Sequence, residues 1–433
     1  MHLDSPLQNL DQYEGAPSDS LRVATREAFD NLIQLAIDEQ VNFVLIAGDL
    51  YDQDSPDFHT PLHVRKQMAL LQRHGIRVFI IQGNHDATRI TKKSYDVVTL
   101  PDNVHVFSTK KPESVCIDEL NTVVHGQGFA TRAVEEDLSA NYPSAKPGWF
   151  NIGLLHTNLG GKESHDNYAP STVEGLRSKG YQYWALGHIH KRDRGIGGPT
   201  QIIHYSGNLQ GRHIRESGAK GCTLVSVDNN HQISMKFKAT DVWRWHECVV
   251  DATGCGSPDE VLDEVAKNID KTLAKADDRS LAVRVRVTGH TTAHRSFKRL
   301  SDHWRTVLQQ LALDRFEDRV WLEKVLWETR ATTSPSTSEI DSSYGDLIAG
   351  VQQTLAGDEV FADIRDQLDV VIKKVPSDPR FESETIDLDD EATTATLVAE
   401  AKELLVARLM DASDPNLDTS VEPDFDGEFG GDA

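Results

Sequence analysis

The chain has 433 residues, enough for about two or three domains with cores of their own. Its formal net charge is −23, and most of that charge lies at one end: residues 339–433 hold 25 acidic and 6 basic residues, whereas residues 1–338 hold 43 and 39. The acidic end would be repelled by nucleic acid, so we expect it to stay solvated or to meet a protein partner. The nearly neutral remainder excludes no class of substrate.

The hydropathy pattern excludes a membrane helix. No apolar run approaches the roughly 18 to 20 residues that such a helix needs, and no basic start with an apolar centre marks a signal peptide. The cysteines form no C-x-x-C pair, and we expect buried small residues rather than disulfides or a zinc knuckle at Cys116, Cys222, Cys248 and Cys255. We therefore expect a soluble cytoplasmic protein with no membrane partner.

The first elements of the chain alternate between helix and strand. Residues 20–40 carry apolar side chains at helical spacing, and an apolar strand follows at residues 43–46. Thr60 and Pro61 predict the N-cap and first turn of a second helix, which is followed by a strand at residues 78–81. This alternation predicts a doubly wound α/β sandwich.

Polar turns follow these strands. Residues 48–52 (GDLYD) come after the first strand and residues 83–86 (GNHD) after the second. Two later apolar runs end in His156 and in residues 187–190 (GHIH). Because parallel strands end at the same edge of a sheet, loops there can gather these side chains into one crevice. Asp, Asn and His suit manganese, iron or zinc, so we expect a metal site at this edge.

These motifs resemble the calcineurin-like metallophosphoesterases, whose pattern is D-x-H, G-D-x-x-D, G-N-H-D/E, a lone His and G-H-x-H. Every block after the first is intact. Within that superfamily the chain is similar to the SbcD-type DNA repair exonucleases, nuclease subunits that work with SMC-like ATPases. Three features favour this branch: no Arg-Gly follows the GDLYD block, the next block ends in Asp86, and residues 206–213 (SGNLQGRH) follow the last block. The resemblance covers roughly residues 2 to 245.

The resemblance implies a two-sheet α/β/β/α sandwich that holds two divalent metal ions, with manganese as the expected metal. Asp49, whose two oxygens can bridge, is the natural shared ligand of two ions about 3.5 to 4 Å apart. The other ligands that the resemblance implies are His2, His190 and the Asp of the first block for one ion, and Asn84, His156 and His188 for the other. His85 lies outside both sets and would stabilise the transition state and protonate the leaving 3′ oxygen.

The first block departs from the family pattern. It should read Asp-x-His, but only Met1 precedes His2, so the Asp and the strand that carries it would fall before the first residue. We expect a misplaced start or a truncated sequence. Asp4 lies on the opposite side of the motif and is a poor substitute for the carboxylate.

From Trp243 the pattern changes to strand, helix, strand, helix, strand, which predicts a small α/β capping domain. Its first helix starts at residues 257–260 (SPDE), a capping box with a proline at the first helical position. The second helix carries a basic face formed by Arg295, Lys298 and Arg299, with Arg305 beyond. Such a face is either a solvated surface or a set of contacts to DNA phosphates.

A helical extension is expected at the C-terminal end, after a Ser- and Thr-rich linker at residues 331–343. Two amphipathic helices would carry apolar stripes formed by Val360, Ile364, Leu368 and Val371 and by Val398, Ala401, Leu405 and Leu409. Neither helix can bury its stripe alone. They pack on the body of the protein or, as the resemblance implies, clamp the coiled coil of the ATPase partner. After Asp411 the acidic sequence predicts disorder.

The expected domains are therefore residues 1–242 for the nuclease, 243–330 for the capping domain, 331–410 for the linker and helices, and 411–433 for the tail. Three functions from different classes remain open. The first is a two-metal-dependent DNA exonuclease and endonuclease of double-strand-break repair that works with an SMC-like ATPase, with a homodimer as a further option. The second is a stand-alone phosphodiesterase or phosphatase for a small substrate. The third is a non-catalytic scaffold, which is the literal interpretation of the missing carboxylate.

Overall fold

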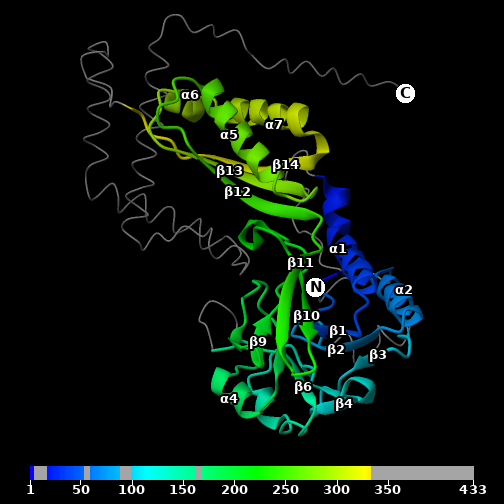
Figure 1. Cartoon of the computed structure of the whole chain (residues 1–433). Helices are drawn as coiled ribbons and strands as arrows, with labels where there is room; N and C mark the ends of the chain where they lie inside the picture. The colour runs from blue at the N-terminus through cyan, green and yellow to red at the C-terminus, as the bar shows by residue number, and fades with distance from the viewer. Residues whose placement is uncertain (4–16, 53–58, 88–98, 161–167, 333–433) are drawn as a thin grey trace, which may run out of the picture. The chain divides into compact units, whose positions relative to one another are not determined.

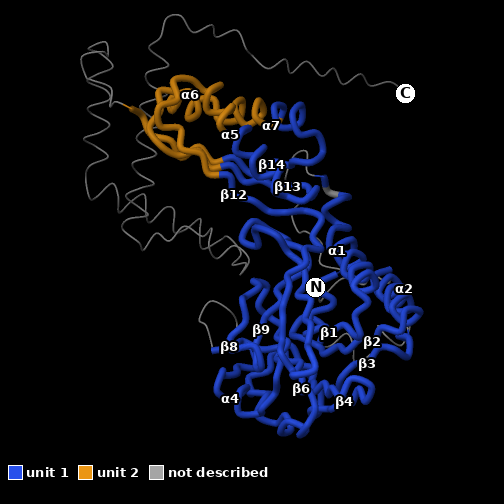
Figure 2. The backbone as a smooth tube through the Cα atoms, in the orientation of Figure 1, with its two compact units in different colours: residues 1–248, 265–285, 310–325 blue, residues 249–264, 286–309, 326–433 orange. Residues whose placement is uncertain are grey.

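The computed structural model describes residues 1–3, 17–52, 59–87, 99–160 and 168–332 (Figure 1). The chain divides into two compact units, drawn in different colours in Figure 2. Unit 1 comprises Met1–Cys248, Val265–Val285 and Gln310–Val325; unit 2 comprises Val249–Glu264, Arg286–Gln309 and Leu326–Ala433. None of the helices in the described ranges has the length and apolar character needed to span a membrane.

Helices and strands alternate through most of the described chain. The helices are α1 (Ser18–Asp38), α2 (His59–Arg73), α4 (Val173–Ser178), α5 (Pro258–Leu273), α6 (His294–Arg299) and α7 (Ser301–Phe316). The strands are β1 (Phe43–Ala47), β2 (Arg77–Ile81), β3 (Val104–Val106), β4 (Glu113–Ile117), β5 (Thr122–Gly126), β6 (Phe150–His156), β7 (Tyr183–Gly187), β8 (Ile196–Gly198), β9 (Gln201–Tyr205), β10 (Gly221–Val227), β11 (Ile233–Ala239), β12 (Trp243–Asp251), β13 (Ser280–Thr288) and β14 (Val320–Trp327).

Two sheets, one of three strands and one of six, organise unit 1. The first has the order β1-β2-β3 with all strands parallel, and the second has the order β4-β5-β6-β7-β9-β8. Strands β5, β6, β7 and β9 are parallel, and the two edge strands β4 and β8 are antiparallel to their neighbours. The mixed α/β fold predicted from the sequence is therefore confirmed.

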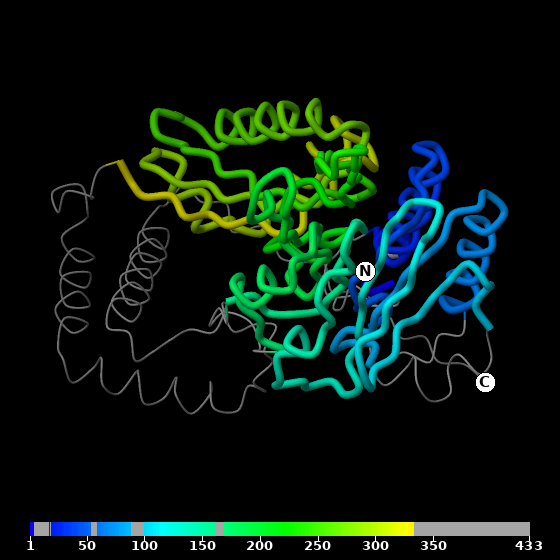
Figure 3. Tube along the Cα trace, turned by 60° about the horizontal axis from the view of Figure 1, so that its bottom comes forward, coloured from blue at the N-terminus to red at the C-terminus, as the bar shows by residue number. Residues whose placement is uncertain are grey.

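The two sheets pack face to face because their strands alternate between two apolar layers. In β2, Val78 and Ile80 pack with helices α1 and α2, whereas Phe79 belongs to the core shared with the six-stranded sheet. In β6, Leu154 belongs to that same inner core, whereas Leu155 packs on the outer side with helix α4. Figures 1 and 3 show α1 and α2 side by side. The layers are helix, sheet, sheet, helix, and the polar turns of the sequence lie at strand ends within them.

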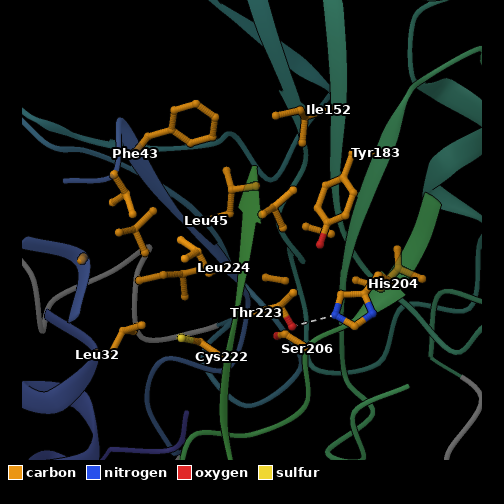
Figure 4. Close-up of a pocket in the computed structure, with 18 of the residues that line it drawn as sticks. Leu32, Phe43, Leu45, Ile152, Tyr183, His204, Ser206, Cys222, Thr223 and Leu224 are labelled. Carbon is orange, nitrogen blue, oxygen red and sulfur yellow. Dashed lines mark hydrogen bonds between the residues drawn. The ribbon is translucent and has the colours of Figure 1, made fainter. Parts of the chain in front are cut away.

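A cavity of about 770 Å³ is lined by β1 and β10 (Figure 4). Phe43 and Leu45 of β1 and Leu224 of β10 form part of its wall. Beside them, the imidazole of His204 hydrogen-bonds through Nε2 to Oγ1 of Thr223 (2.8 Å). The lining also includes residues at the carboxyl end of β1, so the cavity reaches the edge of the sheet where the polar turns lie.

Strands β12, β13 and β14 form a separate three-stranded sheet whose strands run through both units. In unit 1, Trp243, Trp245 and Trp321 pack with apolar residues of helix α1. In unit 2, the ring of Phe297 on α6 stacks on Trp327 of β14 at a centroid distance of 4.2 Å. Aromatic packing therefore supplies much of the core around this sheet.

One predicted helix start agrees with the structure and another differs from it. Helix α5 starts as predicted: Oγ of Ser257 accepts a hydrogen bond from the backbone of Glu260 (3.3 Å), and Pro258 is the first residue of the helix. Helix α2 begins at His59 rather than after Thr60, whose hydroxyl accepts a hydrogen bond from Arg26.

The prediction of a single basic helix is wrong. It is divided into α6 and α7, because Leu300 leaves the helical conformation (φ −116°, ψ 42°). The indole of Trp304 on α7 donates to Oγ of Ser296 on α6 (2.9 Å), and this contact ties the two helices together. The expectation of buried cysteines holds fully only for Cys248, since Cys116 is exposed. The two predicted C-terminal helices and the acidic tail lie outside the described residues.

Candidate metal centre

The predicted ligands meet at the carboxyl ends of strands in unit 1. Asp49 follows β1, Asn84 follows β2, His156 is the last residue of β6, and His188 follows β7. His2 reaches the same place because its backbone N–H donates to the carbonyl of Asp49 (2.9 Å). The two sheets therefore bring together side chains that lie more than a hundred residues apart in the sequence.

Several of these residues have left-handed backbone conformations. The φ angles are 54° at His2, 52° at Asp49 and 96° at His188. Outside glycine, such a conformation costs about 1 to 3 kcal/mol and persists only where the surrounding structure holds it. Such conformations are common at functional sites, but they also occur in this chain at residues outside the site, such as Gln40 and Asn121, so they do not by themselves assign a role to these turns.

His2, Asp49 and His190 form the first group of donors. Nε2 of His2 lies 3.1 Å from Nε2 of His190 and 3.7 Å from Oδ2 of Asp49. The other ring nitrogen of His190 donates to Oε1 of Glu216 (2.6 Å), which leaves Nε2 of His190 as a lone-pair donor for a metal. Burial lowers the pKa of His2 and of His190, so both rings favour the neutral form that binds metals.

His156 and Asn84 form the second group, again with Asp49. Nε2 of His156 lies 2.9 Å from Oδ1 of Asn84 and 3.5 Å from Oδ2 of Asp49. Nδ1 of His156 donates to the carbonyl of Ala47 (2.8 Å), and burial lowers the pKa of the ring, so Nε2 is an acceptor that faces two other acceptors. A cation among these three atoms resolves that repulsion. The ring of His188 lies beside His156 at a centroid distance of 5.3 Å.

The donors of both groups fit divalent metal ions. Ligands bound at about 2.0 to 2.2 Å from one ion lie roughly 3.0 to 3.6 Å from one another. The four donor distances of the two groups run from 2.9 to 3.7 Å, close to that range. Burial raises the pKa of Asp49, but the neighbouring histidines and the amide of His85 lower it more, so the shared carboxyl group stays ionised. Imidazole, carboxylate and amide donors suit manganese, iron or zinc.

His85 is held by a carboxylate. His2, Asp52 and His85 also offer three donors within 4.8 Å of one another, and within this group Nδ1 of His85 lies at a hydrogen-bond distance of 2.7 Å from Oδ1 of Asp52. Burial lowers the pKa of His85, but the bond to Asp52 and the charge of Asp49 raise it more, so the net shift favours the protonated ring. Its side chain is 30 % exposed. An oriented and accessible imidazole with a raised pKa can donate a proton to a substrate.

Comparison with known proteins places the chain in a family. Residues 13–192 match the calcineurin-like phosphoesterase family, and residues 245–330 match the middle domain of metallophosphoesterase YhaO. The uncharacterized metallophosphoesterase YhaO of Bacillus subtilis (strain 168) is 30% identical over 366 residues, which cover 82% of this chain and 86% of that protein. The chain belongs to the calcineurin-like metallophosphoesterases. Members of this family are phosphoester hydrolases that use divalent metal ions, which agrees with the donor sets above.

The metallophosphoesterase also has more distant relatives that are named DNA double-strand break repair protein Mre11. The protein from Sulfolobus acidocaldarius is 24% identical over 212 residues, which cover 47% of this chain and 54% of that protein. The protein from Methanopyrus kandleri is 22% identical over 298 residues, which cover 64% and 63%. The metallophosphoesterase thus spans between about half and two thirds of the length of these relatives.

Three residues of this metallophosphoesterase site were not predicted as functional residues. Asp52 contacts His85, Glu216 contacts His190, and Arg212 lies between the two carboxylates. Asp52 and Arg212 stand in the GDLYD and SGNLQGRH blocks, so the sequence carried a signal for both. No sequence motif marks Glu216, because its role comes from a hydrogen bond with His190, a residue 26 positions away.

Asp86 has a structural role in the same place. Its carboxylate accepts hydrogen bonds from the backbone N–H groups of Gly83 (2.6 Å) and Leu50 (2.8 Å), and so fastens the second turn to the first. The basic residues predicted to bind DNA lie on α6 in unit 2, where Arg295 and Arg299 are exposed and Lys298 is half-buried.

Proposed function

We propose that the protein is a two-metal-dependent nuclease that hydrolyses phosphodiester bonds in DNA. The observation that carries this proposal is the position of Asp49 between two donor groups. A single carboxylate oxygen lies 3.7 Å from Nε2 of His2 and 3.5 Å from Nε2 of His156. A shared carboxylate is what a site for two ions about 3.5 to 4 Å apart requires.

The residues divide into ligands and a proton donor. His2, His190 and Asp49 would hold one ion, and Asn84, His156, His188 and Asp49 the other. Two divalent ions bound there supply the positive charge that polarises a phosphodiester and activates the attacking water. His85, oriented by Asp52, donates its proton to the oxygen that leaves. Glu216 and the carbonyl of Ala47 fix the rings of His190 and His156, which is the usual function of the groups behind metal ligands.

DNA is supported as the substrate by the relatives named DNA double-strand break repair protein Mre11 and by the exposed basic residues of α6. Manganese is the metal that the resemblance to SbcD-type nucleases favours. That resemblance also supports an SMC-like ATPase as the partner, which the acidic C-terminal sequence would meet through protein contacts, since its charge disfavours DNA.

The central test compares two substrates. Purified protein that is extended to include the strand and Asp of the first block should cleave both DNA and bis(4-nitrophenyl) phosphate with Mn²⁺, lose both activities in EDTA, and regain them when Mn²⁺ is restored. Asp49→Asn is the inactive control, because it weakens the one ligand that both ions share. Hydrolysis of the small diester without cleavage of single-stranded or duplex DNA would refute the proposed substrate and favour a stand-alone phosphodiesterase.

The role of α6 has its own test. A variant with Arg295→Gln, Lys298→Gln and Arg299→Gln should bind DNA more weakly, and the slope of log affinity against log salt should fall by up to about 0.9 for each phosphate that these side chains neutralise in the wild-type protein. A control variant removes the same number of charges from α2, with Arg65→Gln, Lys66→Gln and Arg73→Gln. Equal affinities and slopes for the two variants would show that α6 is only a solvated face.

A further inference from the structure

Arg212 belongs to the SGNLQGRH block, which the proposed mechanism does not use. It comes just before a short 3-10 helix, Ile214–Glu216. Its backbone N–H donates to Oε2 of Glu216 (2.8 Å), which fixes the chain at this point. Its side chain is 19 % exposed and lies among the polar groups of the metal centre.

The guanidinium group of Arg212 lies between two carboxylates. Nη1 is 3.5 Å from Oδ2 of Asp52, and Nη2 is 3.8 Å from Oε1 of Glu216. Nη2 is also 3.5 Å from Nδ1 of His190. One planar cation therefore faces both anions that stand behind the site.

Each of these carboxylates orients one histidine of the proposed mechanism. Asp52 accepts from Nδ1 of His85 (2.7 Å), and Glu216 accepts from Nδ1 of His190 (2.6 Å). His85 is the proposed proton donor and His190 a proposed ligand. The path His85, Asp52, Arg212, Glu216, His190 thus joins the two functions through direct side-chain contacts, and its central member is rigid and always charged.

We propose that Arg212 is a positioning residue that fixes the distance between the proton donor and the metal ligands by holding Asp52 and Glu216 together. The proposal rests on the roles proposed for His85 and His190, and it is independent of whether DNA is the substrate. Without the guanidinium, the two carboxylates repel each other, and both histidines lose their orientation. The charge and the fork shape of the side chain are both needed.

The first experiment uses the full chain with bis(4-nitrophenyl) phosphate. Arg212→Ala should lower kcat by about 10- to 100-fold and weaken the apparent Mn²⁺ affinity by a similar factor, as removal of groups behind metal ligands does, with KM for the diester little changed. Arg212→Lys should restore only part of the rate, since a point charge cannot bridge two anions. Guanidinium ion added to Arg212→Ala should restore part of it as well. Arg215→Ala, in the same segment and exposed, is the matched control and should behave as wild type.

A double-mutant cycle decides between bridging and other roles. Arg212→Ala combined with Asp52→Asn, and separately with Glu216→Gln, should reduce kcat by a factor well below the product of the two single reductions. Multiplicative reductions in either cycle, or a rise in KM at constant kcat, would overturn the proposal. Mn²⁺ affinity measured by calorimetry gives a second readout that needs no turnover: an unchanged affinity in folded Arg212→Ala overturns it too. A failure of the proposed DNA activity has a different result: the wild-type protein then hydrolyses the diester but does not cleave DNA.

Discussion

Two histidines of the site, His85 and His156, have pKa values that are shifted in opposite directions. Nδ1 of His156 donates to the carbonyl of Ala47, a neutral acceptor, whereas Nδ1 of His85 donates to the carboxylate of Asp52. Burial lowers the pKa of His156. For His85, the carboxylates outweigh burial and raise the pKa. The neutral ring suits a metal ligand and the charged ring suits a proton donor.

His85→Gln tests this division. The variant should retain its bound metal but lose about 10²- to 10⁴-fold in kcat, because glutamine can hydrogen-bond to Asp52 and cannot donate a proton as an acid does. His156→Gln is the matched comparison and should lose metal as well as rate. Metal content by mass spectrometry and kcat with Mn²⁺ are the two measurements. A His85→Gln protein that binds less metal than wild type would mean that His85 is a ligand.

At the scale of the elements, glycines let the strand ends approach the ring of His156. A Cβ atom on Gly48 would lie 2.5 Å from Nδ1 of His156, and one on Gly187 would lie 1.7 Å from the carbonyl oxygen of Ala47. On Gly83 it would lie 2.3 Å from Oδ1 of Asp49 and 2.6 Å from Cε1 of His156. The turns at Gly48, Gly83 and Gly187 therefore need glycine, because any larger side chain would prevent the strand ends from coming this close together.

Gly83→Ala should accordingly disrupt the metal centre. The added methyl group displaces Asp49 or His156, so Mn²⁺ affinity and activity should fall by at least about tenfold, and the strain of about 1 to 3 kcal/mol should lower the melting temperature by several degrees. Gly198→Ala on β8 is the control, since a Cβ there meets nothing within 4 Å. Calorimetric Mn²⁺ titrations and thermal melts of both variants check this. Wild-type metal binding in Gly83→Ala would show that the turn can relax without cost to the site.

The sequence predicted the elements whose pattern is local. Strands β1, β2, β6 and β7 are apolar runs that end in recognisable turns, and the ligands of the candidate site follow directly from those turns. Strands β10 and β11 were not predicted, because only their pairing with each other makes a hairpin of residues that, apart from Gly221 and Ile233, are half-buried or exposed. The same limit applies to Glu216, whose role depends on its contact with His190, a residue 26 positions away in the sequence.

At the scale of the whole molecule, the excess negative charge is concentrated in the C-terminal sequence, whereas the residues of the candidate metal centre come earlier in the chain. Every residue of the candidate metal centre lies at or before Glu216, whereas 25 of the 68 acidic residues lie in residues 339–433. The apolar stripes expected at residues 360–371 and 398–409 lie outside the described residues, so their role remains the prediction made from the sequence.

Cutting the chain after Ser334 tests that prediction. Burial of about four large apolar side chains on a partner, at roughly 1.5 to 3 kcal/mol each, offers a large gross driving force even after the costs of ordering. If the stripes serve a partner, the shortened protein should keep its melting temperature and its Mn²⁺-dependent hydrolysis of bis(4-nitrophenyl) phosphate, because it keeps the whole metal centre. It should lose co-purification with an SMC-like ATPase and any stimulation by ATP. If the stripes instead belong to the core of this protein, the shortened chain should aggregate or melt several degrees lower, and that result would exclude partner docking as their main role.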